Sequence, residues 1–145
     1  MRFFLADVSV WVALTYDRHL DHSLVRRWFD AAEDGRLFFC RISQLGLLRL
    51  LTNSALMGGD VLSQQEAWRT YDRARSHPRV GFQAEPEAFE AQFRKLTQSP
   101  HPRTKHWSDA YLAALALTSD LHVITLDKTF PRVHGLEVLC LASTP

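Results

Sequence analysis

The fold is indicated most clearly by residues 2–14, which read Arg2-Phe3-Phe4-Leu5-Ala6-Asp7-Val8-Ser9-Val10-Trp11-Val12-Ala13-Leu14. The first part, Arg2–Ala6, is short and mostly apolar, and it predicts a β-strand that stops at Asp7. The next segment, Val8–Leu14, carries no charge and predicts the start of a helix. A strand followed at once by a helix is what an α/β domain is expected to begin with.

The same alternation continues along the chain. Further strands are predicted at Leu37–Cys40, Val80–Gln83, His122–Leu126 and Glu137–Leu141. Helices are predicted from Asp21 to Gly35, from Ser43 to about Thr52, from Ser63, from Pro86 and over Asp109–Ser119. Alternating strands and helices predict an α/β fold whose parallel sheet is covered by helices on both faces.

Local signals place the ends and the buried faces of these helices. Side-chain caps are expected from Asp21, Ser43, Ser63 and Ser108, with Glu66 completing a capping box and Pro86 at a first helical position. The third helix is expected to carry Leu45, Leu48 and Leu51 or Thr52, and on the fourth helix Trp68 and Tyr71 are expected to face inward.

Composition limits the class of protein. The 145 residues suit one domain, residues 1–145, and 46% of them are hydrophobic, which is too many for a disordered chain. The formal net charge of +1 excludes a strongly basic nucleic-acid binder. Two cysteines exclude a disulfide scaffold, and the apolar surroundings of Cys40 and Cys140 predict buried free thiols.

The compartment is predicted from the absence of long apolar segments. No stretch approaches the roughly 18 apolar residues that cross a bilayer. The apolar run near the N-terminus is shorter than the ~7–15 residues at the centre of a signal peptide. We therefore expect a cytoplasmic protein with no membrane partner.

Three aspartates stand where a ligand site is expected. Asp7 and Asp127 directly follow strands, and ligands of open α/β sheets bind outside the carboxyl ends of the strands. Asp109 stands at the predicted start of the most apolar helix. Clustered carboxylates without histidine or cysteine favour Mg²⁺ or Mn²⁺, and the hydroxyls of Ser9 and Thr125 are candidates to hold a carboxylate or a metal-bound water.

Ordinary structural roles explain the same aspartates equally well. Asp109 fits a helix N-terminus, where the dipole favours an acid, and Asp7 and Asp127 fit turns after strands. The residues alone leave both interpretations open.

A basic segment leads into Asp109. Between Glu90 and Asp109 the chain has no acid, and its cations there are Arg94, Lys95, Arg103 and Lys105. A second basic set consists of Arg69, Arg73, Arg75 and Arg79. Such cations suit RNA phosphates, although a solvated loop and helix face would have the same composition.

Four segments resemble the PIN-domain family, and within it the VapC-type toxins of bacterial toxin–antitoxin pairs. They are Leu5–Leu14, Ile42–Asn53, Ser108–Ala116 and Val123–Phe130. The resemblance implies a three-layer α/β/α sandwich with a central, mostly parallel sheet of four to five strands. It also implies a Mg²⁺-dependent endoribonuclease, with Mn²⁺ as a second candidate ion, that is inhibited by a cognate antitoxin and forms a homodimer.

Carried over residue by residue, Asp7, Asp109 and Asp127 match the metal-binding acids of the family, and Thr125 matches the small hydroxyl residue before the last acid. Gly46 departs from the pattern, because many members have an acid on the central helix at this position. Its absence removes a negative charge and is expected to weaken metal binding, with Glu85, Glu87 and Glu90 as candidates to compensate. Gly46 also keeps open an alternative function, a non-catalytic module that binds RNA or protein.

Overall fold

The computed structural model describes residues 2–142. The elements follow one another as β1 (Phe3–Ala6), α1 (Val8–Thr15), α2 (His22–Ala31), β2 (Arg36–Phe39), α3 (Arg41–Leu51), α4 (Ser54–Met57), the short 3₁₀ helix η1 (Gly58–Asp60), α5 (Gln64–Arg75), β3 (Val80–Phe82), α6 (Phe89–Leu96), α7 (His106–Thr118), β4 (His122–Thr125) and β5 (Val138–Cys140). The predicted single domain, residues 1–145, includes Met1 and residues 143–145, which lie outside the described residues.

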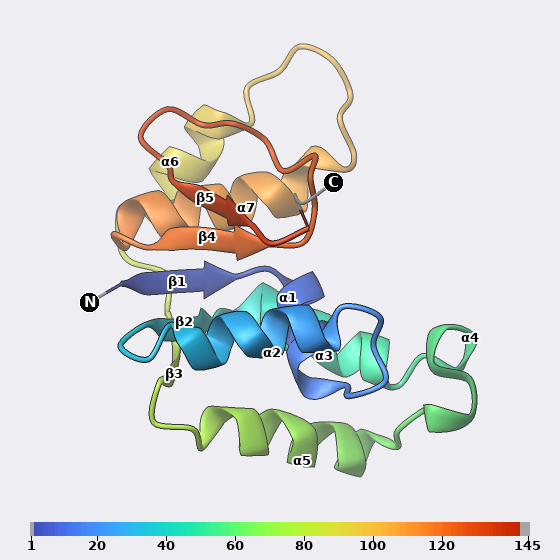
Figure 1. The fold of residues 1–145 in the computed structure, drawn as a ribbon. Helices are drawn as coiled ribbons and strands as arrows, with labels where there is room; N and C mark the ends of the chain where they lie inside the picture. The colour runs from blue at the N-terminus through green and yellow to red at the C-terminus, as the bar shows by residue number, and fades with distance from the viewer. Residues whose placement is uncertain (1, 143–145) are drawn as a thin grey trace.

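The five strands form one parallel sheet with the order β3-β2-β1-β4-β5 (Figure 1). β1 lies in the middle, between β2 and β4, and the two halves of the chain extend the sheet in opposite directions from it. The carboxyl ends of β1 and β4 therefore meet at a topological switch point, where ligand sites of open α/β sheets lie.

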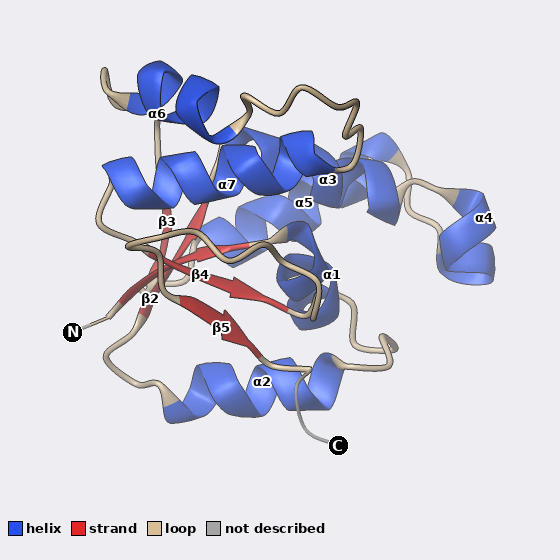
Figure 2. Ribbon diagram, turned by 90° about the horizontal axis from the view of Figure 1, so that it is seen from above, coloured by secondary structure: helices blue, strands red, loops and turns tan. Residues whose placement is uncertain are grey.

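Helices cover both faces of the sheet, as the sequence predicted. Figure 2 shows α6 and α7 on one side of the strands and α2 on the other. Alternate residues of the buried strands enter separate cores, with Phe4 and Ile124 on the α2 side and Leu5 and Val123 on the α7 side. The protein is a three-layer α/β/α sandwich.

Helix α7 is buried on almost all sides because it lies between the sheet and α6. Every side chain from Ala110 to Ala116 is buried, which explains why the sequence of this helix is apolar without a polar stripe.

Several predicted helix ends were wrong by one turn or less. α3 begins at Arg41, so Ser43 does not cap it from outside; its Oγ instead accepts a hydrogen bond of 2.9 Å from Cys40 N. α7 begins at His106, which puts Ser108 inside the first turn. α6 begins at Phe89, after a turn in which Phe89 N donates to Pro86 O, so Pro86 is not its first residue.

Other local predictions had mixed outcomes. The capping box of Ser63 and Glu66 is confirmed, whereas Asp21 precedes α2 without a side-chain capping bond. Leu51 and Tyr71 are buried as predicted. Trp68 is 47% exposed, so its prediction as an inward-facing residue was wrong, and Leu45 on the third predicted helix is 54% exposed.

The prediction of a buried free thiol is confirmed for Cys40, whereas Cys140 is only half-buried. Within residues 2–142, no helix combines the length and the apolar character that crossing a membrane requires.

Candidate active site

Asp7 and Asp127 follow two strands that are paired side by side. Ala6 at the end of β1 is in register with Ile124 in β4, and Asp7 N donates a 3.0 Å hydrogen bond to Ile124 O. Asp127 lies two residues beyond the end of β4. The sheet register therefore brings both aspartates to the same edge, as predicted from the sequence.

Thr125 connects these two aspartates. Its side chain is fully buried, and its hydroxyl donates to Asp7 Oδ2 at 2.9 Å while accepting from Asp127 N at 3.0 Å. Ser9 makes a different contact, because its Oγ accepts a 3.3 Å hydrogen bond from Leu126 N. Thr125 thus orients a carboxylate, whereas Ser9 attaches α1 to the chain that leaves β4.

Asp7 also begins helix α1. Its Oδ1 accepts a hydrogen bond of 2.7 Å from Val8 N, and its backbone carbonyl accepts from Val10 N. Its carboxylate therefore lies at the positive end of the helix dipole, which favours a negative charge.

The three aspartates interact electrostatically. Burial raises the pKa of Asp7, and the charge of Asp127 raises it further against the opposing hydrogen bonds from Thr125 and Val8. Burial also raises the pKa of Asp109, and the charges of Asp7 and Asp127 add to this effect. Like charges that raise one another's pKa are relieved by a bound cation.

Asp127 differs from the other two. It is exposed, and its Oδ1 accepts hydrogen bonds from the hydroxyl and the amide of Thr129 at 2.7 and 2.8 Å. These bonds lower the pKa of Asp127. It remains ionised under conditions that would begin to protonate Asp7 and Asp109.

The donor set fits a hard divalent cation by its chemistry. Carboxylate oxygens are ligands that Mg²⁺ accepts, and this ion commonly uses one or two carboxylates while keeping several waters. Among residues 2–142, no three histidine, cysteine, aspartate or glutamate side chains converge closely enough to hold a metal together. Asp7, Asp109 and Asp127, predicted as three metal ligands, are thus not grouped closely enough in the described structure to hold an ion between them.

The predicted cations fall into two groups in the fold. Arg103 and Lys105 line a cavity together with Asp109 and Thr129. Arg94 and Lys95 lie in the last turn of α6, where Arg94 forms a 3.0 Å ion pair with Glu90.

Arg79, a member of the second basic set, has a structural role. Its guanidinium lies 3.8 Å from the ring centroid of Phe29 and donates to the backbone oxygens of Phe29 and Ala32. These carbonyls belong to the end of α2, so Arg79 satisfies acceptors that the helix leaves open.

Gly46 allows α1 and α3 to approach closely. A Cβ at this position would lie 2.8 Å from Val8 Cγ2. Two of the three glutamates considered as substitutes for an acid here have other partners: Glu85 accepts a 2.6 Å hydrogen bond from Tyr111, and Glu90 pairs with Arg94.

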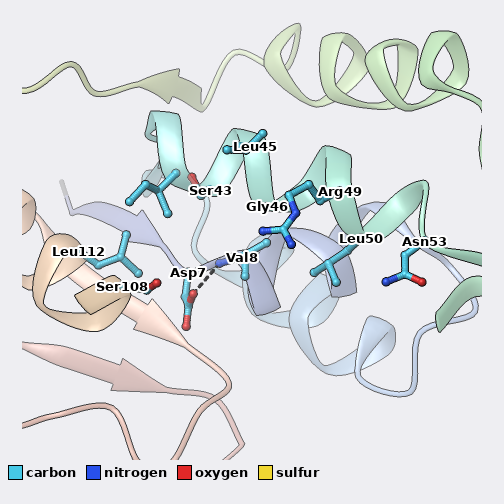
Figure 3. A pocket seen from close by; sticks show the side chains of 11 residues that line it. Asp7, Val8, Ser43, Leu45, Gly46, Arg49, Leu50, Asn53, Ser108 and Leu112 are labelled. Atoms are coloured by element: carbon cyan, nitrogen blue, oxygen red, sulfur yellow. Dashed lines mark hydrogen bonds between the residues drawn. The ribbon is translucent and has the colours of Figure 1, made fainter. Parts of the chain in front are cut away.

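A pocket beside Asp7 contains residues to which the sequence gave no functional role. Its walls are the start of α1, one face of α3 and the first turns of α7 (Figure 3). Arg49 and Asn53 of α3 and its C-terminal flank, and Ser108 of α7, line it together with Asp7. Arg49 and Asn53 could have been found in the sequence from their helical spacing relative to Gly46, because this spacing places the three residues on one face.

Comparison with known proteins gives a consistent result. A family model described as the PIN domain matches residues 4–136. Ribonuclease VapC41 of Mycobacterium tuberculosis is 38% identical over 143 residues, an alignment that covers 95% of this chain and 98% of the relative.

Solved structures share the fold at low sequence identity. VapBC2 from Rickettsia felis, crystallised with a DNA fragment from its promoter, has a TM-score of 0.69 at 11% identity and covers 94% of this chain and 96% of its own. VapC20 from Mycobacterium tuberculosis, a toxin that cleaves the Sarcin–Ricin loop, has a TM-score of 0.62 at 14% identity, covering 88% and 92% of the two chains.

Proposed function

The chain belongs to the PIN-domain family, and we propose that it is a toxin that cleaves RNA as a Mg²⁺- or Mn²⁺-dependent endoribonuclease and is neutralised by a cognate antitoxin. The observation that carries the proposal is the connection of Asp7 and Asp127 through the buried Thr125 hydroxyl. A buried threonine that orients one acid and positions the backbone of another has the geometry of a prepared ligand site.

Each acid has a distinct part in the proposed site. Asp7 is the central ligand, because two hydrogen bonds fix its orientation and partial burial strengthens its interaction with a cation. Asp127 supplies an exposed carboxylate whose lowered pKa favours its ionised form, and Asp109 adds charge from α7. When bound, a divalent ion would supply an activated water and neutralise charge on the phosphodiester.

The basic residues supply the approach for RNA. Arg103 and Lys105 share a cavity with Asp109, so they are suited to hold a phosphate next to the acidic site. Arg94 and Lys95 lie beyond them at the end of α6, where they attract the polyanion at longer range.

The partners follow from the relatives. Structures similar to this chain include VapBC complexes, in which the toxin occurs with its antitoxin. For the present protein we therefore propose a cognate antitoxin and a homodimeric state. We also propose that it acts in the cytoplasm, where RNA is available.

The test is cleavage of total RNA and of defined oligoribonucleotides with Mg²⁺, with Mn²⁺ and with EDTA. We expect cleavage that requires the ion and that is abolished in Asp7→Asn, while Arg27→Gln, which changes an exposed charge on α2, retains it. Metal-independent cleavage, or full activity of Asp7→Asn, would contradict the proposal.

A second function remains a specific competitor because of Gly46. The helix face that lines the pocket beside Asp7 carries no acid, which reduces the negative charge available to a metal. A module that binds RNA without cutting it would show retention of labelled RNA and no products with either ion.

A further inference from the structure

The pocket beside Asp7 has a size and lining suited to a small planar group. Its volume is about 340 Å³, within the range of ligand pockets. Much of its wall is apolar, formed by Val8, Ile42, Leu45, Leu50 and Leu112. Gly46 also lines the pocket, and it carries no side chain that could fill it; a Cβ there would lie 2.8 Å from Val8 Cγ2.

Two opposite charges line the pocket, those of Asp7 and Arg49. Figure 3 shows the Arg49 guanidinium turned into the space in front of Gly46 and Val8, on the side away from Ser108. Arg49 is exposed, and within residues 2–142 its guanidinium has no hydrogen bond or ion pair. Its five donors are therefore available to an anion.

Asn53 contributes a donor with a fixed orientation. Its Oδ1 accepts hydrogen bonds from Ala55 N at 3.0 Å and Leu56 N at 3.4 Å, which caps α4. Because the oxygen is used in this way, the amide NH₂ is the part of the side chain left for a ligand.

We propose that this pocket is a nucleotide subsite of the RNA substrate, adjacent to the acidic site at Asp7. The base lies on the apolar wall, Arg49 binds the next phosphate along the strand, and the Asn53 amide donates to an acceptor on the base. This inference rests on the proposed function, because it assigns a place to the same RNA.

The charges favour RNA as the occupant. In a single strand, flat bases alternate with phosphates. The pocket offers an apolar wall for a base and, beside it, an unpaired guanidinium for a phosphate. Arginine binds phosphate through two parallel hydrogen bonds, so one free arginine beside the acidic site sets the direction in which the strand leaves it.

The first test measures binding without catalysis. Fluorescence anisotropy with a labelled single-stranded oligoribonucleotide in EDTA compares the wild type with Arg49→Gln, Arg49→Lys and the matched charge control Arg27→Gln. We expect Arg49→Gln to weaken binding about 10-fold and to reduce the slope of log affinity against log salt by about 0.7, the value for one phosphate contact to a single strand. Arg49→Lys should keep the slope and lose part of the affinity, because the lysine keeps the charge without the paired donors.

The second test separates binding from chemistry. In the metal-supplemented assay, Arg49→Gln should raise KM several-fold with kcat nearly unchanged. Asn53→Ser keeps a good helix cap but lacks the amide donor, so we expect it to change the preference among oligonucleotides that differ in one base without lowering the melting temperature.

The outcomes distinguish this inference from the proposed function. If the wild type cleaves RNA and Arg49→Gln has the affinity, salt slope and KM of Arg27→Gln, the subsite is wrong while the ribonuclease stands. If RNA binds through Arg49 but is never cleaved, the subsite stands without the enzyme. If RNA neither binds nor is cleaved with either ion, both fall. If Arg49→Gln leaves RNA binding unchanged but abolishes inhibition by the antitoxin, the pocket is a protein site and the inference is overturned.

Discussion

The Thr125 hydroxyl donates to Asp7 Oδ2 across 2.9 Å, joining two residues that are 118 positions apart in the chain. The same hydroxyl accepts from Asp127 N. One fully buried oxygen therefore fixes both the orientation of one acid and the start of the loop that carries another.

Replacing Thr125 by valine keeps the shape of the side chain and removes both hydrogen bonds. Asp7 loses a donor and the amide of Asp127 loses its acceptor, so we expect a cost of about 1–3 kcal/mol in unfolding free energy. RNA cleavage should fall about 10–100-fold, as for other groups that orient metal ligands. Urea unfolding and initial cleavage rates measure the two effects, and Thr125→Ser should largely preserve both. Unchanged cleavage by the valine variant would show that this hydroxyl has no part in the site.

Asp7→Asn should separate stability from activity. The folded protein raises the pKa of Asp7, so it binds a proton more readily than the unfolded chain does, and the ionised carboxylate reduces stability once the pH exceeds both pKa values. Asparagine removes this charge but keeps only one oxygen to accept from Val8 N and the Thr125 hydroxyl, so the change at any one pH also includes a lost hydrogen bond. The melting temperature of Asp7→Asn relative to that of the wild type should therefore be higher at pH 7 than at pH 5, while cleavage is lost. A difference in melting temperature that does not change with pH would contradict this account.

A divalent ion should stabilise the fold through the same acids. Because an ion that binds only the folded state raises its stability, we expect Mn²⁺ to raise the melting temperature of the wild type more than that of Asp7→Asn or Asp109→Asn. Protons compete for Asp7 and Asp109, whose pKa values are raised, so the shift should be smaller at pH 5 than at pH 7.5. Asp72→Asn on the exposed side of α5 is the control and should show the wild-type shift. Equal shifts in all variants would place the ion elsewhere.

Gly46 and Val8 should be energetically coupled. An alanine at position 46 gains about 1 kcal/mol of helix propensity but places its Cβ against a stiff β-branched side chain, which costs about 1–3 kcal/mol. We expect Gly46→Ala to destabilise the wild type and to stabilise the Val8→Ala variant. A double-mutant cycle by urea unfolding measures the coupling, expected at about 1–2 kcal/mol. Additive effects would show that the two helices are free to move apart.

Arg79→Lys should reduce stability without reducing RNA affinity. Lysine cannot stack on Phe29 while donating to the two carbonyls at the end of α2, so we expect a loss of about 1–3 kcal/mol. Arg73→Lys, at an exposed position of α5, is the control and should be neutral in unfolding. Weaker oligonucleotide binding by Arg79→Lys with unchanged stability would return Arg79 to the RNA-binding set.

The sequence predicted the order of strands and helices along the chain. Each buried parallel strand is a short apolar run, which can be identified without knowing which strand lies next to it in the sheet. It also placed Asp7 and Asp127 at one edge, since strand ends follow directly from the strands. The contact between Thr125 and Asp7 depends on β1 and β4 being neighbours, which spacing along one chain does not reveal.

Predictions from the sequence were wrong where the type or spacing of a residue fits more than one structural role. Ser43 has the chemistry of a helix cap and instead forms part of the first turn of α3. Leu45 and Trp68 follow a helical period but lie on exposed faces, since periodicity identifies a stripe without saying what covers it. In the sequence, Arg79 cannot be distinguished from other surface arginines. Its carbonyl partners lie at the end of α2, which is distant in the chain and adjacent only in the fold.

The sheet order also has a consequence for synthesis of the protein. Asp7 is translated 118 positions before Thr125, which lies in β4, its neighbour in the sheet. A nascent polypeptide still lacking β4 holds the first acid without the threonine that orients it. The candidate site therefore cannot assemble on the ribosome until β4 and the Asp127 loop have emerged.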